Sequence, residues 1–136
     1  MDLEQIRAYR NDRSAFSRKM GIVTTEIREG YARAVKTIGT DDTNPVGRCQ
    51  GGVLFTLADI ACGSAAVSHG TKAVTMNASY NFLRGCRPGD VITAEAREVK
   101  RGATVSVYDA VLTDQKGQLV GTATMHYYDL KEPLEE

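Results

Sequence analysis

The chain of 136 residues is long enough for one domain with a hydrophobic core. Apolar residues make up 42% and charged residues 25%, as in ordinary globular proteins rather than disordered ones. Seventeen basic side chains balance seventeen acidic ones, which argues against nucleic acid or an anionic membrane as a partner. No uninterrupted apolar run reaches the ~18 to 20 residues of a membrane span, and the charged start lacks the apolar core of a signal peptide.

The three cysteines, Cys49, Cys62 and Cys86, share no CxxC spacing. The sequence therefore suggests neither a disulfide framework nor a zinc site, and we expect no metal. Unpaired thiols fit a reducing compartment, so we predict a cytoplasmic protein. A Cys49 nucleophile would need a base, and the chain offers only His69 and His126. We interpret the cysteines as ordinary thiols.

The first part of the chain predicts a helix, a hairpin and a loop. Residues 3–20 place apolar side chains at roughly helical intervals, with a break expected near Asn11–Asp12. Ile22–Ile27 and Tyr31–Ile38 are rich in β-branched residues and are separated by Glu29–Gly30, a pattern typical of a hairpin. The polar segment GTDDTNPVGRCQ follows and predicts a loop.

One long helix is predicted from Gly51 to about Ser68. Its apolar residues leave almost no polar face, and a helix that is apolar on all sides is normally buried. Such a helix must be wrapped by a curved sheet or covered by a second subunit.

The second half of the chain predicts four strands. After the helix the apolar period changes to two, which indicates first a strand with one apolar face. Short turns join the last three strands, so these pair antiparallel. The acidic tail, residues 129–136, is expected to be frayed. The whole chain, residues 1–136, is thus predicted to be a single α+β domain. The expected strands are Ala73–Leu83, Val91–Val99, Thr104–Leu112 and Leu119–Tyr128.

Asp59 is the single carboxylate inside the apolar helix. An ionised carboxylate in apolar surroundings costs several kcal/mol unless it is paired or hydrogen-bonded. One interpretation is structural: a buried ion pair or a hydrogen bond to the backbone. The other is functional: a general base or nucleophile whose surroundings tune its reactivity.

Gly51–Gly52 stand where this helix should begin. A helix N-terminus presents unpaired N–H groups and a partial positive charge, and glycine lets a ligand approach the backbone closely. These are the components of an oxyanion hole, although two glycines are also common punctuation between a loop and a helix. Asp59 lies eight residues beyond Gly51, about 12 Å along the helix axis. One carbonyl group cannot touch both, so a shared reaction requires Gly51 of another subunit in a two-fold dimer.

The pattern N-x-x-G-x-x-[HQ]-G-G-x-x-x-x-L-x-D resembles the signature of hotdog-fold acyl-CoA thioesterases. Within them it is similar to the phenylacetate-degradation (phenylacetyl-CoA) and thioesterase superfamily member 2 group. The segments AVTMNASYNFLRGCRPGDVITAEA and TDQKGQLVGTATMHYY resemble later parts of the same family, so the likeness covers about residues 20–128. The motif is formed here by Asn44, Gly47, Gln50, Gly51, Gly52, Leu57 and Asp59.

The resemblance implies a hotdog fold, a curved antiparallel sheet wrapped around one central helix, and a role for each matching residue. Asp59 corresponds to the catalytic carboxylate and Gly51 to the amide that polarises the carbonyl. Asn44 corresponds to a side chain that orients water or the thioester, and Thr75 to a hydroxyl that helps to hold the water. The implied ligand is a coenzyme A thioester as substrate, with no metal or redox cofactor. The family also implies a homodimer at minimum, commonly paired into a homotetramer.

On the substrate side, Gln50 and Gly52 belong to the motif. Many relatives have histidine at the position of Gln50. Glutamine cannot take up a proton, but it can donate a hydrogen bond to an oxygen and orient a substrate. The departure therefore bears on rate and substrate preference more than on the type of reaction.

The phosphates of coenzyme A need local positive charge in a protein of zero net charge. The candidates are Arg84 and Arg87, after the first of the four strands, and Lys100 and Arg101, at a later turn. Arginine can bind phosphate oxygens bidentately. The alternative is that these side chains are only solvated charges.

Hydrolysis of an acyl-CoA thioester is the leading hypothesis, with Asp59 either activating water or attacking the carbonyl itself. A hotdog dehydratase or hydratase is a second hypothesis, but it would pair a histidine with an acid, and neither histidine lies in the motif. A third is a non-catalytic acyl-CoA-binding or regulatory protein, in which Gln50 marks lost chemistry.

Overall fold

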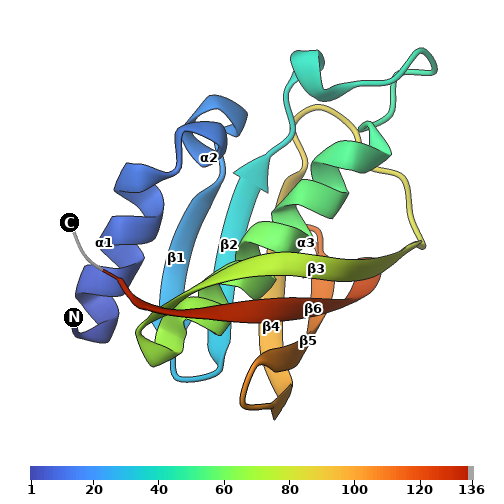
Figure 1. The fold of residues 1–136 in the computed structure, drawn as a ribbon. Helices are drawn as coiled ribbons and strands as arrows, with labels where there is room; N and C mark the ends of the chain where they lie inside the picture. The colour runs from blue at the N-terminus through green and yellow to red at the C-terminus, as the bar shows by residue number, and fades with distance from the viewer. Residues whose placement is uncertain (135–136) are drawn as a thin grey trace.

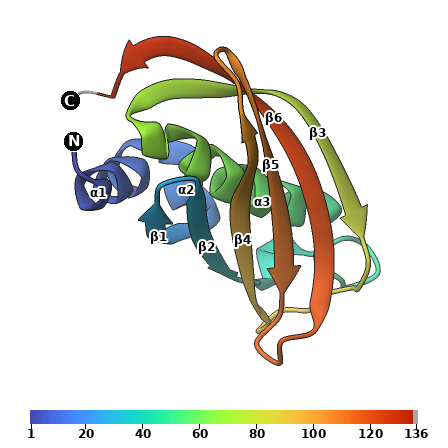
Figure 2. The ribbon, with the colours of Figure 1, turned by 90° about the horizontal axis from the view of Figure 1, so that it is seen from below.

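The structure is a computed structural model that describes residues 1–134. One six-stranded antiparallel sheet, with strand order β1-β2-β4-β5-β6-β3, curves around the helix α3 (Figures 1 and 2). The predicted α+β architecture, a curved sheet around one central helix, is confirmed. The helices are α1 (Leu3–Arg13), α2 (Ala15–Met20) and α3 (Gly51–Ala66), with short 3-10 turns η1 (Thr40–Asp42) and η2 (Val67–His69). The strands are β1 (Val23–Arg28), β2 (Tyr31–Thr37), β3 (Thr71–Phe82), β4 (Val91–Arg101), β5 (Val105–Thr113) and β6 (Leu119–Pro133).

The N-terminal helix is broken, as predicted, but the break lies at Ser14, two residues beyond Asp12. Ser14 has an extended backbone and its side chain accepts a hydrogen bond from the Ser17 N–H, so it ends α1 and caps α2. Asn11 stays helical because its side chain bonds the backbone of β1 instead of capping the helix. Its Nδ2 donates to the Thr24 oxygen at 2.9 Å and its Oδ1 accepts from the Thr24 N–H at 2.8 Å. These two bonds hold α1 on β1.

Small side chains allow α3 to pack closely against the sheet. The helix contacts β2, β4 and β5, and the facing strand positions are alanines, which leave room for a helix backbone. By length and composition the segment Gly51–His69 could cross a membrane, but most of it is buried inside the sheet, so it is a core helix. The fully buried residues at this contact are Leu57, Ala58, Ala61, Cys62 and Ala65 on the helix and Ala32, Ala34, Ala94, Ala96 and Ala110 on the strands.

One stripe of α3 is not covered by the other residues that the structure describes. Gly52 and Phe55 are exposed, and Thr56 and Asp59 are half-buried. These four residues recur at helical spacing and so lie along one face of the helix. We call them the open stripe. The helix is therefore apolar on nearly all sides, as predicted, but buried on only part of its circumference.

Strand β3 is an edge strand, because it pairs with β6 alone. A register shift between Thr75 and Asn77 interrupts this pairing. Because of this bulge, Thr75 and Ala78 both point to the inner face, opposite buried Tyr127 and Met125. The predicted single apolar face is therefore wrong. Val74 pairs with exposed Tyr128, whereas Ala78 and Tyr80, after the bulge, pack against the core.

The C-terminal segment is ordered further than predicted. β6 continues to Pro133, and Leu134 is buried with its N–H bonded to the Gly70 oxygen at 3.0 Å. The expectation of fraying is thus wrong for residues 129–134, which the backbone pairing and the Leu134 side chain hold in place. Residues 135 and 136 lie outside the described residues.

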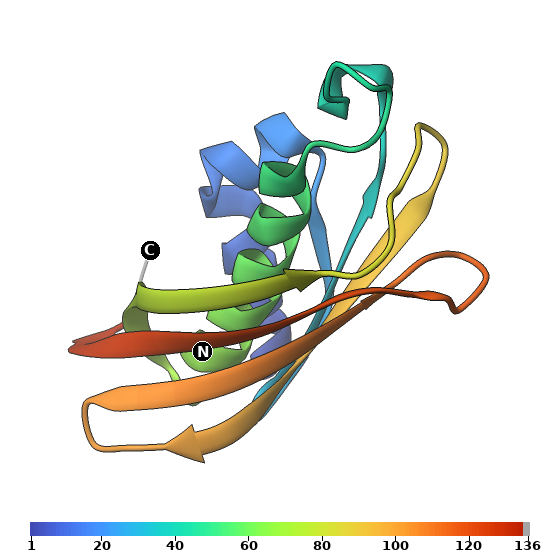
Figure 3. The same cartoon turned by 90° about the vertical axis from the view of Figure 1, so that its right-hand side faces the viewer.

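A buried ion pair fixes the loop that leads into α3. Lys36 Nζ lies 3.1 Å from Asp42 Oδ2, and both side chains are largely buried. Asp42 also accepts the Gly39 N–H through its carboxylate and the Gln50 N–H through its backbone oxygen. The loop lies beside the β3–β4 connection at one end of the sheet (Figure 3), where the Cys49 N–H donates to the Cys86 oxygen at 2.8 Å. The start of α3 is therefore held from two sides.

Candidate active site

The Asp59 carboxylate is hydrogen-bonded by two hydroxyl groups. Thr75 Oγ1 donates to Asp59 Oδ1 at 2.7 Å, and the Tyr127 hydroxyl lies 2.5 Å from the same oxygen. The Tyr127 hydroxyl is also 2.8 Å from the Asp59 backbone oxygen. Within residues 1–134, no group is hydrogen-bonded to Asp59 Oδ2. One carboxylate oxygen is thus held in place, and the other has no hydrogen-bond partner among these residues.

Three elements bring this group together. Thr75 and Tyr127 are cross-strand partners on β3 and β6, and the bulge in β3 turns Thr75 toward the helix. Burial raises the pKa of the Tyr127 hydroxyl, and the nearby Asp59 charge raises it further. Tyr127 therefore stays protonated and acts as a donor. Two hydroxyl donors on the carboxylate thus offset part of the free-energy cost of its partial burial.

The start of α3 leaves backbone donors free. Gln50 occupies the N-cap position with φ −61° and ψ 134°, and its side chain makes no capping hydrogen bond. In the described part of the chain, neither the Gly51 N–H nor the Gly52 N–H is bonded to a backbone oxygen. An added Cβ at Gly51 would lie 3.0 Å from the Phe82 ring, whereas Gly52 has open space around it. Gly51 is thus a close-packed position whose amide remains available.

A cleft of about 340 Å³ opens beside Gly51. It brings three of the predicted site residues together: Asn44, Gly51 and Arg84. Asp59, Thr75 and Arg101 do not line it, in keeping with the distance along the helix that separates Asp59 from Gly51. The lining of the cleft combines apolar side chains with polar and basic ones. Its lining residues are Asn44, Arg48, Cys49, Gly51, Leu54, Phe82, Leu83, Arg84, Gly85 and Cys86.

The Asn44 side chain holds the loop in front of the cleft. Its Oδ1 accepts the N–H groups of Val46 and Arg48 at 3.1 and 3.0 Å, and its backbone groups bond Arg48 and Gly47. Gly47 has φ +80°, a conformation that favours glycine. The Asn44 oxygen is therefore occupied by its own loop, whereas the side-chain NH₂ has no hydrogen-bond partner among residues 1–134.

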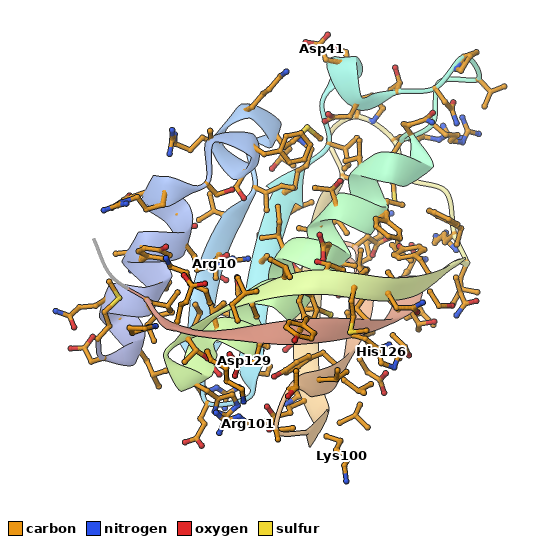
Figure 4. The ribbon with its side chains drawn as sticks, viewed as in Figure 1. Arg10, Asp41, Lys100, Arg101, His126 and Asp129 are labelled. Atoms are coloured by element: carbon orange, nitrogen blue, oxygen red, sulfur yellow. The ribbon has the colours of Figure 1, made fainter. Side chains whose placement is uncertain are left out.

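The basic candidates fall into two groups at opposite ends of the fold. Arg84 lines both the cleft and an adjoining hollow of about 300 Å³ that also contains Arg87. Lys100 and Arg101 lie at the other end of the sheet, away from Asp41 and its loop (Figure 4). Arg101 lines a separate cavity with His69.

Sequence reasoning missed two residues of the site, Tyr127 and Arg48. Tyr127 reads as one more apolar position in a strand, and nothing in its spacing marks it as a partner of Asp59. Arg48 lies within the recognised motif at a position that the motif leaves unspecified. Its side chain packs against Gly85, where an added Cβ would lie 3.5 Å from Arg48 Cδ. Only the three-dimensional arrangement identifies either one.

The other nucleophile and base candidates lie apart from Asp59 or are unreactive. Burial raises the pKa of Cys49 to about 12 and that of Cys86 to about 11, so neither is a thiolate at neutral pH. His69 Nε2 lies 2.6 Å from Glu98 Oε1, and His126 is on β6 opposite Asn77. Neither histidine reaches the Asp59 group, which weakens the dehydratase hypothesis.

Comparison with known proteins agrees with this arrangement. Residues 47–121 match the model of the thioesterase superfamily. An acyl-coenzyme A thioesterase, PaaI of Escherichia coli, is 35% identical over 112 residues, which cover 82% of this chain and 79% of that protein. The structure of the E. coli PaaI protein superposes with a TM-score of 0.94 at 28% identity, covering 98% of this chain and 96% of that one.

A hypothetical thioesterase of Streptococcus pneumoniae, solved with coenzyme A, superposes with a TM-score of 0.79 at 29% identity. The alignment covers 83% of this chain and 88% of that one. The same pneumococcal protein has been solved with one aspartate replaced by alanine and, separately, with one threonine replaced by alanine. Those two residues are 16 positions apart, the same separation as Asp59 and Thr75.

The fold and the matched residues place the chain in the thioesterase superfamily, whose members of this shape have the hotdog fold. Within the superfamily, the chain is a hotdog protein of the PaaI type. The resemblance inferred from the Asn44–Asp59 motif is thereby confirmed.

The loop function of Asn44 can be measured directly. We expect Asn44→Ala to increase amide hydrogen exchange at Val46 and Arg48 and to lower the free energy of unfolding by about 1–2 kcal/mol, because two backbone donors lose their acceptor. Asn44→Asp keeps the accepting oxygen and should retain most of the protection. Equal exchange in all three proteins would contradict this function of the side chain.

Proposed function

We propose that the protein is an acyl-CoA thioesterase, which hydrolyses a thioester to a free acid and coenzyme A. The observation that carries the proposal is the Asp59 carboxylate, anchored through Oδ1 by Thr75 and Tyr127 with Oδ2 left free on the open stripe. A second support is the pneumococcal relative, in which an aspartate and a threonine of the same separation were chosen for substitution.

Two chemical routes use this carboxylate. As a general base, Asp59 Oδ2 takes a proton from water while the water oxygen bonds to the thioester carbon. As a nucleophile, Oδ2 bonds to that carbon itself and forms a mixed anhydride, which water then cleaves. In both routes the C–S bond breaks, and the coenzyme A sulfur leaves as a thiolate that takes up a proton. The Thr75 and Tyr127 hydroxyls hold the carboxylate in position throughout.

The Gly51 N–H is the proposed oxyanion donor. The thioester oxygen becomes negative in the transition state, and a free amide at a helix N-terminus stabilises charge at that point. Gly52 keeps the neighbouring backbone open, and the Gln50 side chain, free of any capping bond, can donate to the substrate.

Asp59 and Gly51 would meet across a two-fold interface, because about 12 Å of helix separates them within one chain. The open stripe and the unpaired edge of β3 provide a surface for a second copy. Four large apolar side chains are exposed there: Phe55, Val74, Met76 and Phe82. An exposed apolar edge strand is otherwise a liability for aggregation. A homodimer would thus contain two equivalent sites, and two dimers would form the proposed homotetramer.

Arginines at the rim of the cleft would hold the phosphates of coenzyme A. Arg48 and Arg84 line the cleft, and Arg87 shares the adjoining hollow with Arg84. Guanidinium groups bind phosphate oxygens bidentately, and no carboxylate lines the cleft among residues 1–134 to oppose them. The pantetheine arm of the substrate would then run from this rim toward the Gly51 amide.

The direct test is a panel of acyl-CoA thioesters in which release of free thiol is measured alongside binding. Thiol release that saturates with substrate supports a thioesterase. Saturable binding without thiol release would instead indicate the acyl-CoA-binding protein considered from the sequence.

We expect Asp59→Asn to lower kcat by at least ~100-fold while the fold is retained, because the substitution removes the charge and keeps the size. Asp109→Asn is a control, since Asp109, an exposed residue of β5, also accepts a hydrogen bond from a threonine, Thr124, at 2.7 Å. Thiol release and the circular dichroism spectrum are measured for both. Turnover of Asp59→Asn at the level of the control would rule out the assignment.

Gly51→Pro should remove the oxyanion donor selectively. Proline is tolerated at the first position of a helix, and the extended backbone of Gln50 suits a residue before proline. We expect kcat to fall by about 100-fold or more. Gly51→Ala brings the same Cβ contact with Phe82 but keeps the N–H, so its kcat should fall much less.

The Gly51→Pro variant also tests whether each site is shared between two subunits. In exchanged mixtures of Asp59→Asn and Gly51→Pro subunits, half of the dimers are hybrids and each hybrid has one intact site. Activity should therefore recover to about a quarter of the wild-type value. Mass spectrometry first shows that the subunits have exchanged. If activity then does not recover, the site is not built from two chains.

Arg84→Ala should raise KM for acyl-CoA about 10-fold with kcat nearly unchanged. The lost phosphate contact would be made equally in the bound substrate and in the transition state. The effect should shrink in high salt and disappear with a pantetheine thioester that lacks the nucleotide. Arg101→Ala changes the basic group at the opposite end of the fold. Comparing its KM with that of Arg84→Ala shows which of the two groups binds the phosphates. A larger rise in KM for Arg101→Ala than for Arg84→Ala would overturn the placement of the nucleotide.

A further inference from the structure

Arg10, on α1, inserts its guanidinium between α1 and α3 (Figure 4). Its Nε donates to Ser64 Oγ at 3.0 Å and its Nη2 donates to the Ile60 backbone oxygen at 3.3 Å. Both acceptors are neutral. Among residues 1–134, Arg10 takes part in no ion pair at contact distance. A cation held in this way needs compensation from a charge further off.

The compensating charge is the Asp59 carboxylate, which lies on the side of Gly63 away from Arg10. An added Cβ at Gly63 would be 3.0 Å from Arg10 Nη2 and 3.5 Å from Tyr127 Cε2. The guanidinium and the Tyr127 ring therefore flank the same glycine, and the Tyr127 hydroxyl bonds Asp59. Ile60, whose oxygen accepts from Arg10, directly follows Asp59. Burial lowers the pKa of Arg10, and Tyr127 and Asp59 act against that shift.

We propose that Arg10 is a positioning residue for Asp59, one that compensates the carboxylate charge and fixes the helical turn that carries it. The inference rests on the proposed function of Asp59. Arg10 touches neither the substrate nor the reacting atoms; it acts through the 59–64 turn of α3 and through its charge. The N-terminal helix α1 thereby becomes part of the catalytic unit rather than a cover for the sheet.

The other groups around Asp59 do not supply this charge. Tyr127, from β6, is a neutral donor, and Thr75, from β3, does not titrate. Cys62, from α3 itself, has a pKa raised by burial and by the Asp59 charge, so it also stays neutral. Arg10, from α1, is the cation that faces this group within the described residues. Its effect should be larger when a second copy covers the open stripe, because excluding water lowers the local dielectric constant.

The test compares Arg10→Met, Arg10→Lys and Arg13→Met. Arg13 lies one turn further along α1, is exposed and stacks on Tyr9 at 5.6 Å, so it serves as a control for loss of a helix arginine. Thiol release is measured between pH 4 and pH 9, together with KM and the melting temperature. For Arg10→Met we expect kcat to fall about 10-fold with KM unchanged, and the acid limb of the kcat profile to move to higher pH by on the order of one unit. Arg10→Lys should restore the position of the limb, and Arg13→Met should match the wild type.

Gly63→Ala keeps the inference testable if Arg10→Met does not fold. Its methyl group would displace the flexible end of Arg10 while preserving every charge, and it should move the acid limb in the same direction. A lower melting temperature with an unmoved acid limb, in either variant, would mean that Arg10 only stabilises the fold and would overturn the inference. If Asp59→Asn itself retains turnover, the proposed function has failed instead. If Asp59→Asn is inactive and the Arg10→Met profile matches the wild type, only the inference about Arg10 has failed.

Discussion

The hydrogen bonds from Thr75 and Tyr127 to Asp59 allow a carboxylate to remain in the most apolar helix of the protein. Without them, the charge would have to be paired, neutralised or moved to a less apolar position. The two donors come from neighbouring strands at the edge of the sheet, so the curvature that wraps the sheet around α3 also delivers both hydroxyls to one oxygen. The close approach of helix and sheet depends on the alanines between them. Core packing and the geometry of the carboxylate are therefore a single constraint.

The length of α3 imposes a second constraint on any chemistry. A helix gives the molecule a free amide at its start and a carboxylate two turns later, but its own rise keeps the two apart. Under the proposed mechanism a monomer would therefore carry two half-sites. A two-fold axis would resolve this at no cost in sequence, because it would bring each half-site to the complementary half of the other copy. The uncovered stripe of α3 and the unpaired edge of β3 are the two surfaces that we propose for such an axis.

Much of this architecture could be predicted from the sequence, because the spacing of apolar residues indicates which face of a helix or strand is buried. The apolar run after Gly51 indicated a central helix, and the short turns after Arg87 indicated antiparallel strands. The errors arose where a side chain overrides the local pattern. Asn11 looked like a helix breaker but bonds to β1, and the acidic tail looked solvated although backbone pairing extends β6 to Pro133.

The site was predictable only in part for the same reason. Asp59, Gly51 and Asn44 lie in one continuous motif and could be recognised together. Tyr127 is 68 residues from Asp59, and in a strand of alternating apolar residues its hydroxyl gives no signal of its partner. Arg10 is equally remote from α3 in sequence. Contacts of this kind depend on how elements pack, which a one-dimensional pattern does not encode.

The bulge in β3 divides one strand into two functional halves. Before it, the inward position is polar and serves Asp59; after it, the inward positions are apolar and line the core beside the cleft. Because side chains alternate along a strand, removing or adding a single residue between these halves would exchange inside for outside in one of them. The two halves can therefore accept substitutions independently, but not insertions or deletions. Variation on the inner face of this strand is thus confined to changes of side chain, while the length of the strand is set by the hydrogen bond from Thr75 to Asp59.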